Sequence, residues 1–445
     1  MSERGLVRGL GVVESTSIVA GTIIGTGIFL KPSAIAAVLG SPGLILGVWV
    51  VGGALSFLGA LSYAELGAMF PEAGGEYVFM RETYGRVWGF LWAWTYFVCA
   101  KIGSIAGLAA GFAIYLKAFV ELPGAWEQVA ACLAIAFVTA VNILGVATGG
   151  RFQALLTGLK IASMIGLTAV ALASPRGSWQ NLQPLVPALK TGLVGAIGIA
   201  LVKVLWAYDG WNDLVMVSGE IRDPQRNILR SLLGGMLIVL ALYLTANLAY
   251  HYALPLGEIA AAERVAEAAV APVLGPRGAM LLSAIILVSI LGALNGSILS
   301  GARIPYAAAV DRLAPAVLAR VHVDYRTPVV ALAVQGACAC GLIGVFTLLR
   351  IANFESITDM VIFAEWAFYM MCCAAVVVLR RREPDRPRPY RAWGYPYAQL
   401  LFVVAAAALF VNSIVESPQT SLIGLGLILL GLPAYRLLRD GVGRG

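Results

Sequence analysis

The stretch Gly21-Thr-Ile-Ile-Gly25-Thr26-Gly27-Ile28-Phe29 places three glycines inside an apolar segment that is long enough to cross a membrane. Glycine lets the backbone leave the helical conformation, and a bilayer tolerates this only where the freed polar groups line a cavity or meet protein. A second cluster, Trp206-Ala-Tyr208-Asp209-Gly210-Trp211-Asn212-Asp213, lies near the middle of the chain. Either cluster alone is explained by close helix packing. As a pair in corresponding positions, they predict two interrupted membrane helices.

The composition of the whole chain agrees with a membrane protein. Of the 445 residues, 60% are hydrophobic and only 12% are charged, whereas soluble domains carry about 25% charged residues. Too few polar residues are present to cover a soluble surface. The six cysteines lie inside apolar stretches, which indicates packing residues and not a disulfide framework or a metal site.

Apolar windows of membrane-spanning length recur along the chain, and they predict twelve spans. Uncharged windows cover residues 32–64, 128–150, 231–257, 278–302, 327–349, 392–415 and 417–435, and windows with isolated charges or glycine clusters cover about 10–38, 87–116, 152–174, 191–218 and 358–379. The two breaks fall in the first and sixth spans. The predicted fold is therefore an all-α polytopic membrane protein with a five-plus-five inverted repeat, helices 1 and 6 broken at midplane, and two C-terminal helices. The expected units are residues 1–180, 181–382 and 383–445.

Most of the basic residues fall in the loops on one side of these spans. This positive-inside pattern places both termini in the cytoplasm, and we expect a cell (plasma) membrane protein in contact with lipid. The net charge of +7 is then an orientation signal and does not indicate nucleic-acid binding.

The chemistry of the two breaks indicates a ligand. At the first break, the N–H groups of Ile24 to Gly27 and the positive end of the following half-helix suit a carboxylate. At the second break, the carbonyls near Trp206, Ala207 and Tyr208 suit an ammonium group. A ligand with both groups a few ångströms apart is an α-amino acid.

Several motifs resemble those of the amino acid, polyamine and organocation (APC) superfamily, and most of all the bacterial relatives of the L-type amino acid transporters. They are the two break sequences, Tyr63-Ala-Glu-Leu-Gly67, Pro71-Glu-Ala-Gly-Gly-Glu-Tyr77, Asp223-Pro224 with Arg226-Asn227, and Gly292-Ala-Leu-Asn-Gly296 with Arg303. The resemblance implies the five-plus-five fold. It also implies alternating access, neutral L-amino acids as substrates and sodium-independent exchange.

The same resemblance implies roles for individual residues. Gly25, Thr26 and Gly27 would hold the substrate carboxylate, while Trp206, Ala207 and Tyr208 would hold the amino group through backbone carbonyls. The side chain of Trp206 would close over the substrate, and Tyr243 resembles an inner-gate tyrosine. Lys160 would take the place of a sodium ion and tie span five to spans one and eight, with Ser289 as the nearest hydroxyl partner.

Charges inside the spans leave alternatives open. Lys160 lies nine residues past Arg151, roughly 14 Å into the bilayer, and could instead carry a proton in a symporter. Lys101 and Lys203 also fall near midplane and each needs a counter-charge, for which Glu14, Asp209 and Glu365 are candidates. Asp209 could instead favour a cationic side chain, as in a cationic amino acid or polyamine antiporter.

Other classes of protein fit less well. No arrangement of catalytic residues indicates an enzyme, and a cavity between two broken helices favours a carrier over a channel. We expect no cofactor, and His251 and His322 are too far apart in sequence to predict a metal site. Animal L-type relatives join a glycoprotein through a cysteine between spans three and four, but residues 117–127 contain none, so no disulfide-linked heavy subunit is expected.

Overall fold

The structure, a computed structural model, describes residues 8–144, 147–185, 192–349 and 354–442. These residues form helices and no β-strand; Leu10 and Ile221 make an isolated bridge. The helices of the first part are α1 (Val12–Ile23), α2 (Gly27–Leu39), α3 (Pro42–Met69), α4 (Glu76–Tyr84), α5 (Arg86–Thr95), α6 (Ile102–Leu116), α7 (Trp126–Ile143) and α8 (Ala147–Leu172). The second part comprises α9 (Leu193–Tyr208), α10 (Asp213–Met216), α11 (Pro224–Ala253), α12 (Leu256–Ala261), α13 (Val265–Gly301), α14 (Arg303–Val310), α15 (Val329–Leu349), α16 (Phe354–Arg382), α17 (Tyr397–Glu416) and α18 (Pro418–Val442).

Ten helical segments in the described residues are long and apolar enough to cross a membrane. Two of the twelve predicted spans, the sixth and the ninth, appear as the shorter apolar helices Leu193–Tyr208 and Val329–Val345. The sixth is short because the backbone becomes extended at Asp209 and Gly210 takes a φ of +106°. A left-handed φ of this kind suits glycine and stops the helix.

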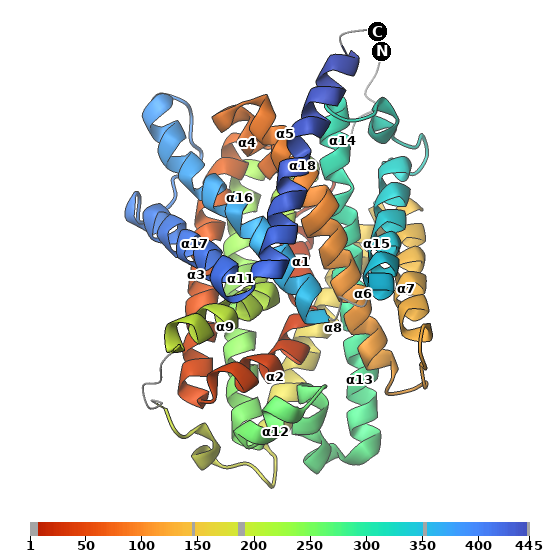
Figure 1. Cartoon of the computed structure of the whole chain (residues 1–445), viewed down its shortest axis with the longest axis vertical. Helices are drawn as coiled ribbons and strands as arrows, with labels where there is room; N and C mark the ends of the chain where they lie inside the picture. Colours follow the sequence, from red (N-terminus) through yellow and green to blue (C-terminus); the bar gives the residue numbers. More distant parts are fainter. Residues whose placement is uncertain (1–7, 145–146, 186–191, 350–353, 443–445) are drawn as a thin grey trace.

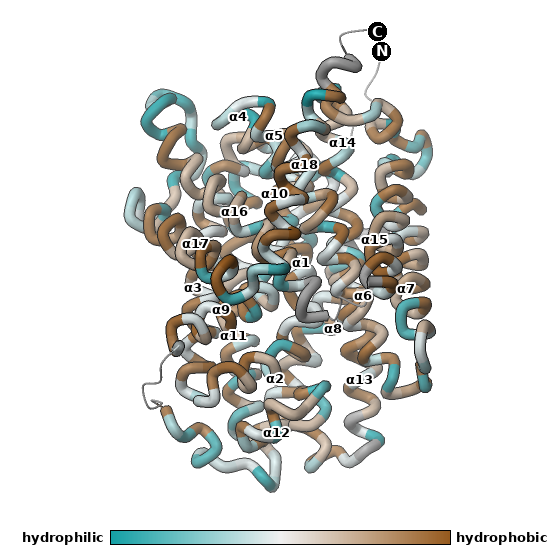
Figure 2. Tube along the Cα trace, in the orientation of Figure 1, coloured by the Kyte–Doolittle hydropathy of each residue, from teal (hydrophilic) through white to brown (hydrophobic). Residues whose placement is uncertain are grey.

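The surface has the character of a membrane protein. Large apolar side chains are exposed on the outer helices, among them Leu133 and Phe137 on α7, Leu155 on α8, Val404 on α17 and Leu422 on α18. A soluble monomer rarely exposes so much contiguous apolar surface. In Figure 2, hydrophilic segments gather at the two ends of the molecule, and hydrophobic residues line the helices between them.

The interrupted helix pair of the N-terminal half lies at the centre of the bundle. Helix α1 packs against α8, α11 and α13, while α2 packs against α9. Figure 1 shows α2 and α12 at the end of the molecule opposite to α4, α5 and the C-terminal end of α18. The two halves of the first span therefore pack mainly on different helices, although both also contact α13.

Two ion pairs, one buried and one partly buried, lie at the end of the molecule that carries α4 and α5. Arg303, in a motif that the sequence singled out, donates to Glu220 at 3.0 Å, and both side chains are almost fully buried. Arg380, at the end of α16, makes two hydrogen bonds of 2.9 and 2.5 Å to Glu65 in α3. These pairs join segments that are far apart in sequence.

Candidate functional site

A small pocket lies where the two interrupted helices meet. Its walls come from the α1–α2 break, the α9–α10 break, α13, and the helix that runs through the π-helical turn Tyr96–Lys101 into α6. The lining residues are Thr22, Ile23, Gly25, Thr26, Gly27, Lys101, Ser104, Leu108, Trp206, Asp209, Gly210, Asp213 and Ser297. The sequence therefore identified both breaks that form the pocket.

The first break presents free N–H groups to the pocket. Helix α1 ends at Ile23 and α2 begins at Gly27. Within the described residues, the N–H groups of Gly25, Thr26 and Gly27 donate to no protein acceptor. The expectation for Ile24 was wrong, because its N–H bonds to the carbonyl of Ala20 and completes the last turn of α1. Of the four N–H groups expected to bind an anion, those of Gly25, Thr26 and Gly27 are available.

The second break ends α9 with free carbonyls. The carbonyl of Trp206 accepts from the N–H of Asp209 at 3.2 Å, whereas those of Ala207 and Tyr208 accept no hydrogen bond from the described residues. A Cβ atom on Gly27 would lie 2.4 Å from the Cα of Ala207, so the two breaks touch through this glycine. The unpaired donors of one break thus lie close to the unpaired acceptors of the other.

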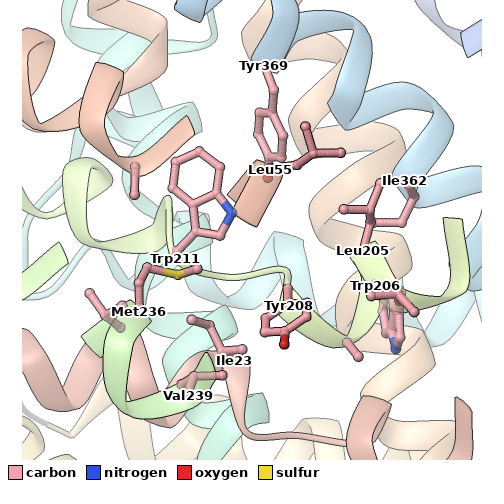
Figure 3. Close-up of a cluster of buried hydrophobic side chains, with 14 of the residues drawn as sticks. Ile23, Leu55, Leu205, Trp206, Tyr208, Trp211, Met236, Val239, Ile362 and Tyr369 are labelled. Carbon is pink, nitrogen blue, oxygen red and sulfur yellow. The ribbon is translucent and has the colours of Figure 1, made fainter. Parts of the chain in front are cut away.

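The two aromatic residues at the end of α9 have different surroundings. Trp206 lines the pocket and is 6% exposed. Tyr208 packs edge-on against Trp49 and tilted against Tyr243, with ring centroids 5.8 and 5.2 Å away. Figure 3 shows Trp206 and Tyr208 on either side of the chain at this point, with Ile23 beside Tyr208. Only Trp206 could close over a ligand with its side chain.

Lys160 reaches the first break from α8. Its Nζ donates to the carbonyls of Gly21 at 2.6 Å and Ile24 at 3.0 Å, and the side chain is 2% exposed. Ser289 in α13 donates to the same Ile24 carbonyl at 3.5 Å. The ammonium of Lys160 therefore bonds to carbonyls that the interruption of α1 leaves without helical partners. Lys160 lies beside the pocket but is not one of its lining residues.

Tyr243 also supports the first break. Its hydroxyl donates to the carbonyl of Ile23 at 2.8 Å from α11. Tyr250, two turns further along the same helix, is equally buried, but its hydroxyl has no partner in the described residues. Of these two buried tyrosines, only Tyr243 donates a hydrogen bond to the first break.

We expect Tyr243→Phe to slow transport of a labelled amino acid by about three- to tenfold, because a net contribution of about 0.5–1.5 kcal/mol is lost at the break. Initial rates in reconstituted vesicles measure the effect. Tyr250→Phe is the matched control and should transport at the wild-type rate. Equal rates for all three proteins would show that the Ile23 carbonyl does not need this donor.

The counter-charges of Lys101 and Lys203 differ from those expected. Lys101 donates to Asp213, and Lys203 pairs with Asp359 at 3.5 Å. Glu14 instead accepts from the N–H of Gly11 at the start of α1. Sequence alone could not choose among the carboxylates, because the choice depends on how the helices are rotated.

Three further pocket residues, Ser104, Leu108 and Ser297, were not anticipated from the sequence. A signal for two of them was present: Lys101, Ser104 and Leu108 are spaced three and four residues apart and so share one helix face. Since a buried lysine in a span must face protein, the same face could have been assigned to the pocket.

These features define a class of proteins: multi-pass membrane proteins with a small polar pocket between two interrupted helices. The family model for amino acid permeases matches residues 10–432. The chain belongs to this family of APC-superfamily amino acid transporters.

Similar proteins cover almost the whole chain. The serine/threonine exchanger SteT of Bacillus subtilis is 31% identical over 97% of this chain and 97% of its own length. The b(0,+)-type amino acid transporter 1 of Mus musculus is 30% identical, over 97% and 88%. The large neutral amino acids transporter small subunit 2 of Homo sapiens is 31% identical, over 97% and 80%.

Proposed function

We propose that this chain exchanges neutral L-amino acids across the cell membrane by alternating access, without sodium and without covalent chemistry. The observation that carries the proposal is the pairing of unbonded N–H groups at Gly25 to Gly27 with unbonded carbonyls at Ala207 and Tyr208. A carboxylate and an ammonium on one carbon satisfy both sets. The names of the relatives, which include a serine/threonine exchanger and a neutral amino acid transporter, support this substrate class.

The proposed fold has twelve spans. Ten are the long apolar segments, and α9 with α10 and α15 supply the other two. We assign residues 1–180 and 181–382 to two inverted five-helix repeats and 383–445 to two additional helices. The positive-inside pattern supports cytoplasmic termini.

Lys160 supports the absence of sodium coupling. Its ammonium is held by two carbonyls of the interrupted α1, and carbonyl oxygens are also what a sodium ion would bind. Because the ammonium of Lys160 already occupies these carbonyls, a sodium ion is not needed to stabilise them. We therefore assign Lys160 a positioning role in place of the proton-carrying role considered from the sequence.

Reconstituted vesicles test the proposal. Vesicles loaded with unlabelled L-serine should take up labelled L-serine at least tenfold faster than empty vesicles, equally in sodium and in choline buffer. Labelled L-arginine should not enter under the same conditions. Uptake that requires sodium, or arginine uptake that exceeds that of serine, would contradict the proposed mode or substrate class.

A further inference from the structure

A buried cluster of acidic side chains adjoins the pocket on the side of the second break. Asp209 and Asp213 line the pocket, and Glu76 in α4 and Glu365 in α16 lie behind them. The side chains of Glu76, Asp213 and Glu365 are almost fully buried, and that of Asp209 is half-buried. The basic partner within this cluster is Lys101, whose ammonium donates to Asp213. The neutral amino acid site described above does not account for the remaining carboxyl groups.

Glu365 has the least support for a negative charge. Its side chain is 1% exposed, and its Oε2 lies 3.4 Å from the hydroxyl of Tyr369. Its carboxyl group also lies within hydrogen-bonding reach of the carboxyl group of Asp209, and that contact needs a proton on one of the two. The Tyr369 hydroxyl lies nearer to Asp209, at 2.9 Å from Oδ1. One hydroxyl hydrogen serves one carboxylate. A buried carboxylate without a donor is so costly that the group holds a proton instead.

Among the described neighbours of Glu365, Lys101 carries a positive charge, but its ammonium donates to Asp213. The charged and titratable groups around it are Tyr96, Cys99 and Lys101 from the helix of the π-turn, Glu76 from α4, and Asp209 and Asp213 from the second break. Tyr63 of α3 contacts the ring of Tyr369, at 6.0 Å between centroids. Helix α9, which also packs on α16, carries Lys203, and the ammonium of Lys203 pairs with Asp359 of α16 at 3.5 Å.

A path for a proton leads from the pocket to Glu365. Asp209 lines the pocket, and the hydroxyl of Tyr369 lies 2.9 Å from its carboxyl group and 3.4 Å from that of Glu365. The two carboxyl groups also contact each other directly. Asp209 also follows directly on the carbonyls of Ala207 and Tyr208, which are proposed to hold the ammonium. An ammonium there favours the ionised form of Asp209, which then keeps the Tyr369 hydrogen and leaves Glu365 to hold a proton of its own.

We propose that Asp209, Tyr369 and Glu365 form a proton-binding site, and that the amino acid crosses the membrane together with one proton on Glu365. This rests on the proposed function, since the pocket must hold an amino acid. The proton is taken from water on one side and released to water on the other when the pocket opens there. In exchange, the carrier changes its orientation in both directions with an amino acid and a proton bound.

Accumulation under a pH gradient tests this proposal. Vesicles without internal amino acid, acidic outside by one pH unit and clamped at zero potential, should accumulate labelled L-serine. One proton per amino acid supports a ratio of up to about tenfold. A pH-sensitive dye inside the vesicles should report acidification when unlabelled L-serine is added. No accumulation and no dye signal in vesicles that do exchange L-serine would overturn the proposal and leave the proposed function intact.

The variant Glu365→Gln tests whether Glu365 carries the proton, because glutamine resembles a permanently protonated glutamate. It should exchange L-serine but show no accumulation and no dye signal. Glu383→Gln, just beyond the end of the same helix at the surface, is the matched control and should accumulate L-serine as the wild type does. Accumulation by Glu365→Gln at the wild-type ratio would place the proton elsewhere.

Tyr369→Phe is a second variant, needed if Glu365→Gln does not assemble. It removes the bridging hydroxyl and leaves both carboxyl groups. We expect exchange to continue with a lower accumulation ratio, and an unchanged ratio would contradict the bridge. Loss of wild-type exchange under every condition would instead refute the proposed function.

Discussion

Gly27→Ala is expected to abolish amino acid exchange. A Cβ at this position would lie 2.4 Å from the Cα and 2.7 Å from the Cβ of Ala207, where the two breaks touch. Overpacking in a well-packed core typically costs about 1–3 kcal/mol, and here the obstacle is backbone, which cannot turn aside as a side chain can. The free N–H groups and the free carbonyls would be forced apart. Initial exchange rates of labelled L-serine in reconstituted vesicles should fall at least a hundredfold.

Gly47→Ala makes the same chemical change in a harmless place. Gly47 lies in α3 on an exposed face, and a Cβ there would meet no heavy atom within 4 Å. This control should exchange L-serine at the wild-type rate and show that alanine in a membrane helix is itself tolerated. Comparable rates for Gly27→Ala and Gly47→Ala would mean that the contact between the breaks is not needed for transport.

The second large effect is expected for Lys160→Met. Methionine keeps most of the volume of the side chain but leaves the carbonyls of Gly21 and Ile24 without the ammonium that now bonds to both. A buried polar group that loses its partner costs about 1–3 kcal/mol. The Gly21 carbonyl loses its donor, and the Ile24 carbonyl keeps only the long bond from Ser289. Both lie at the end of α1 beside Gly25, so the exchange rate should fall at least thirtyfold.

Lys117→Met is the matched control for this charge. Lys117 lies at the end of α6, about one-third exposed, and pairs with Glu127 at 3.2 Å. Exposed pairs contribute little, so this variant should exchange L-serine normally. If Lys160→Met exchanged L-serine within twofold of Lys117→Met, the lysine would not be the support of the first break.

The two breaks could be predicted from sequence because they depend on local chemistry. Glycines within Gly21 to Phe29, and Gly210 after Tyr208, allow the chain to leave the helix wherever the rest of the protein folds. The same local rule explains why Ile24 was misassigned. Whether a residue at a helix end donates inside the helix or outside it depends on one turn of geometry, and helix ends are uncertain by one or two residues.

The pairing of charges could not be predicted for a different reason. Lys101 and Asp213 are 112 residues apart in sequence, and Lys101 had several carboxylates within the apolar spans to choose from. Residue count places a charge at a depth in the membrane, but it does not say which way the helix is turned. The sequence singled out Asp209 and Glu365 as candidate counter-charges but could not predict that Tyr369 contacts both. In sequence, Tyr369 is one aromatic residue among several in an apolar helix.

Competition for L-serine exchange tests most directly whether the two breaks bind the carboxylate and the ammonium of an amino acid. Labelled L-serine exchange should be inhibited by unlabelled L-serine, but not by a hundredfold excess of ethanolamine, which lacks the carboxylate, or of N-acetyl-L-serine, which lacks the ammonium. Selective failure of both analogues is the predicted result. Inhibition by ethanolamine at the same concentration as L-serine would contradict the assignment of the N–H groups of Gly25, Thr26 and Gly27 to the substrate carboxylate.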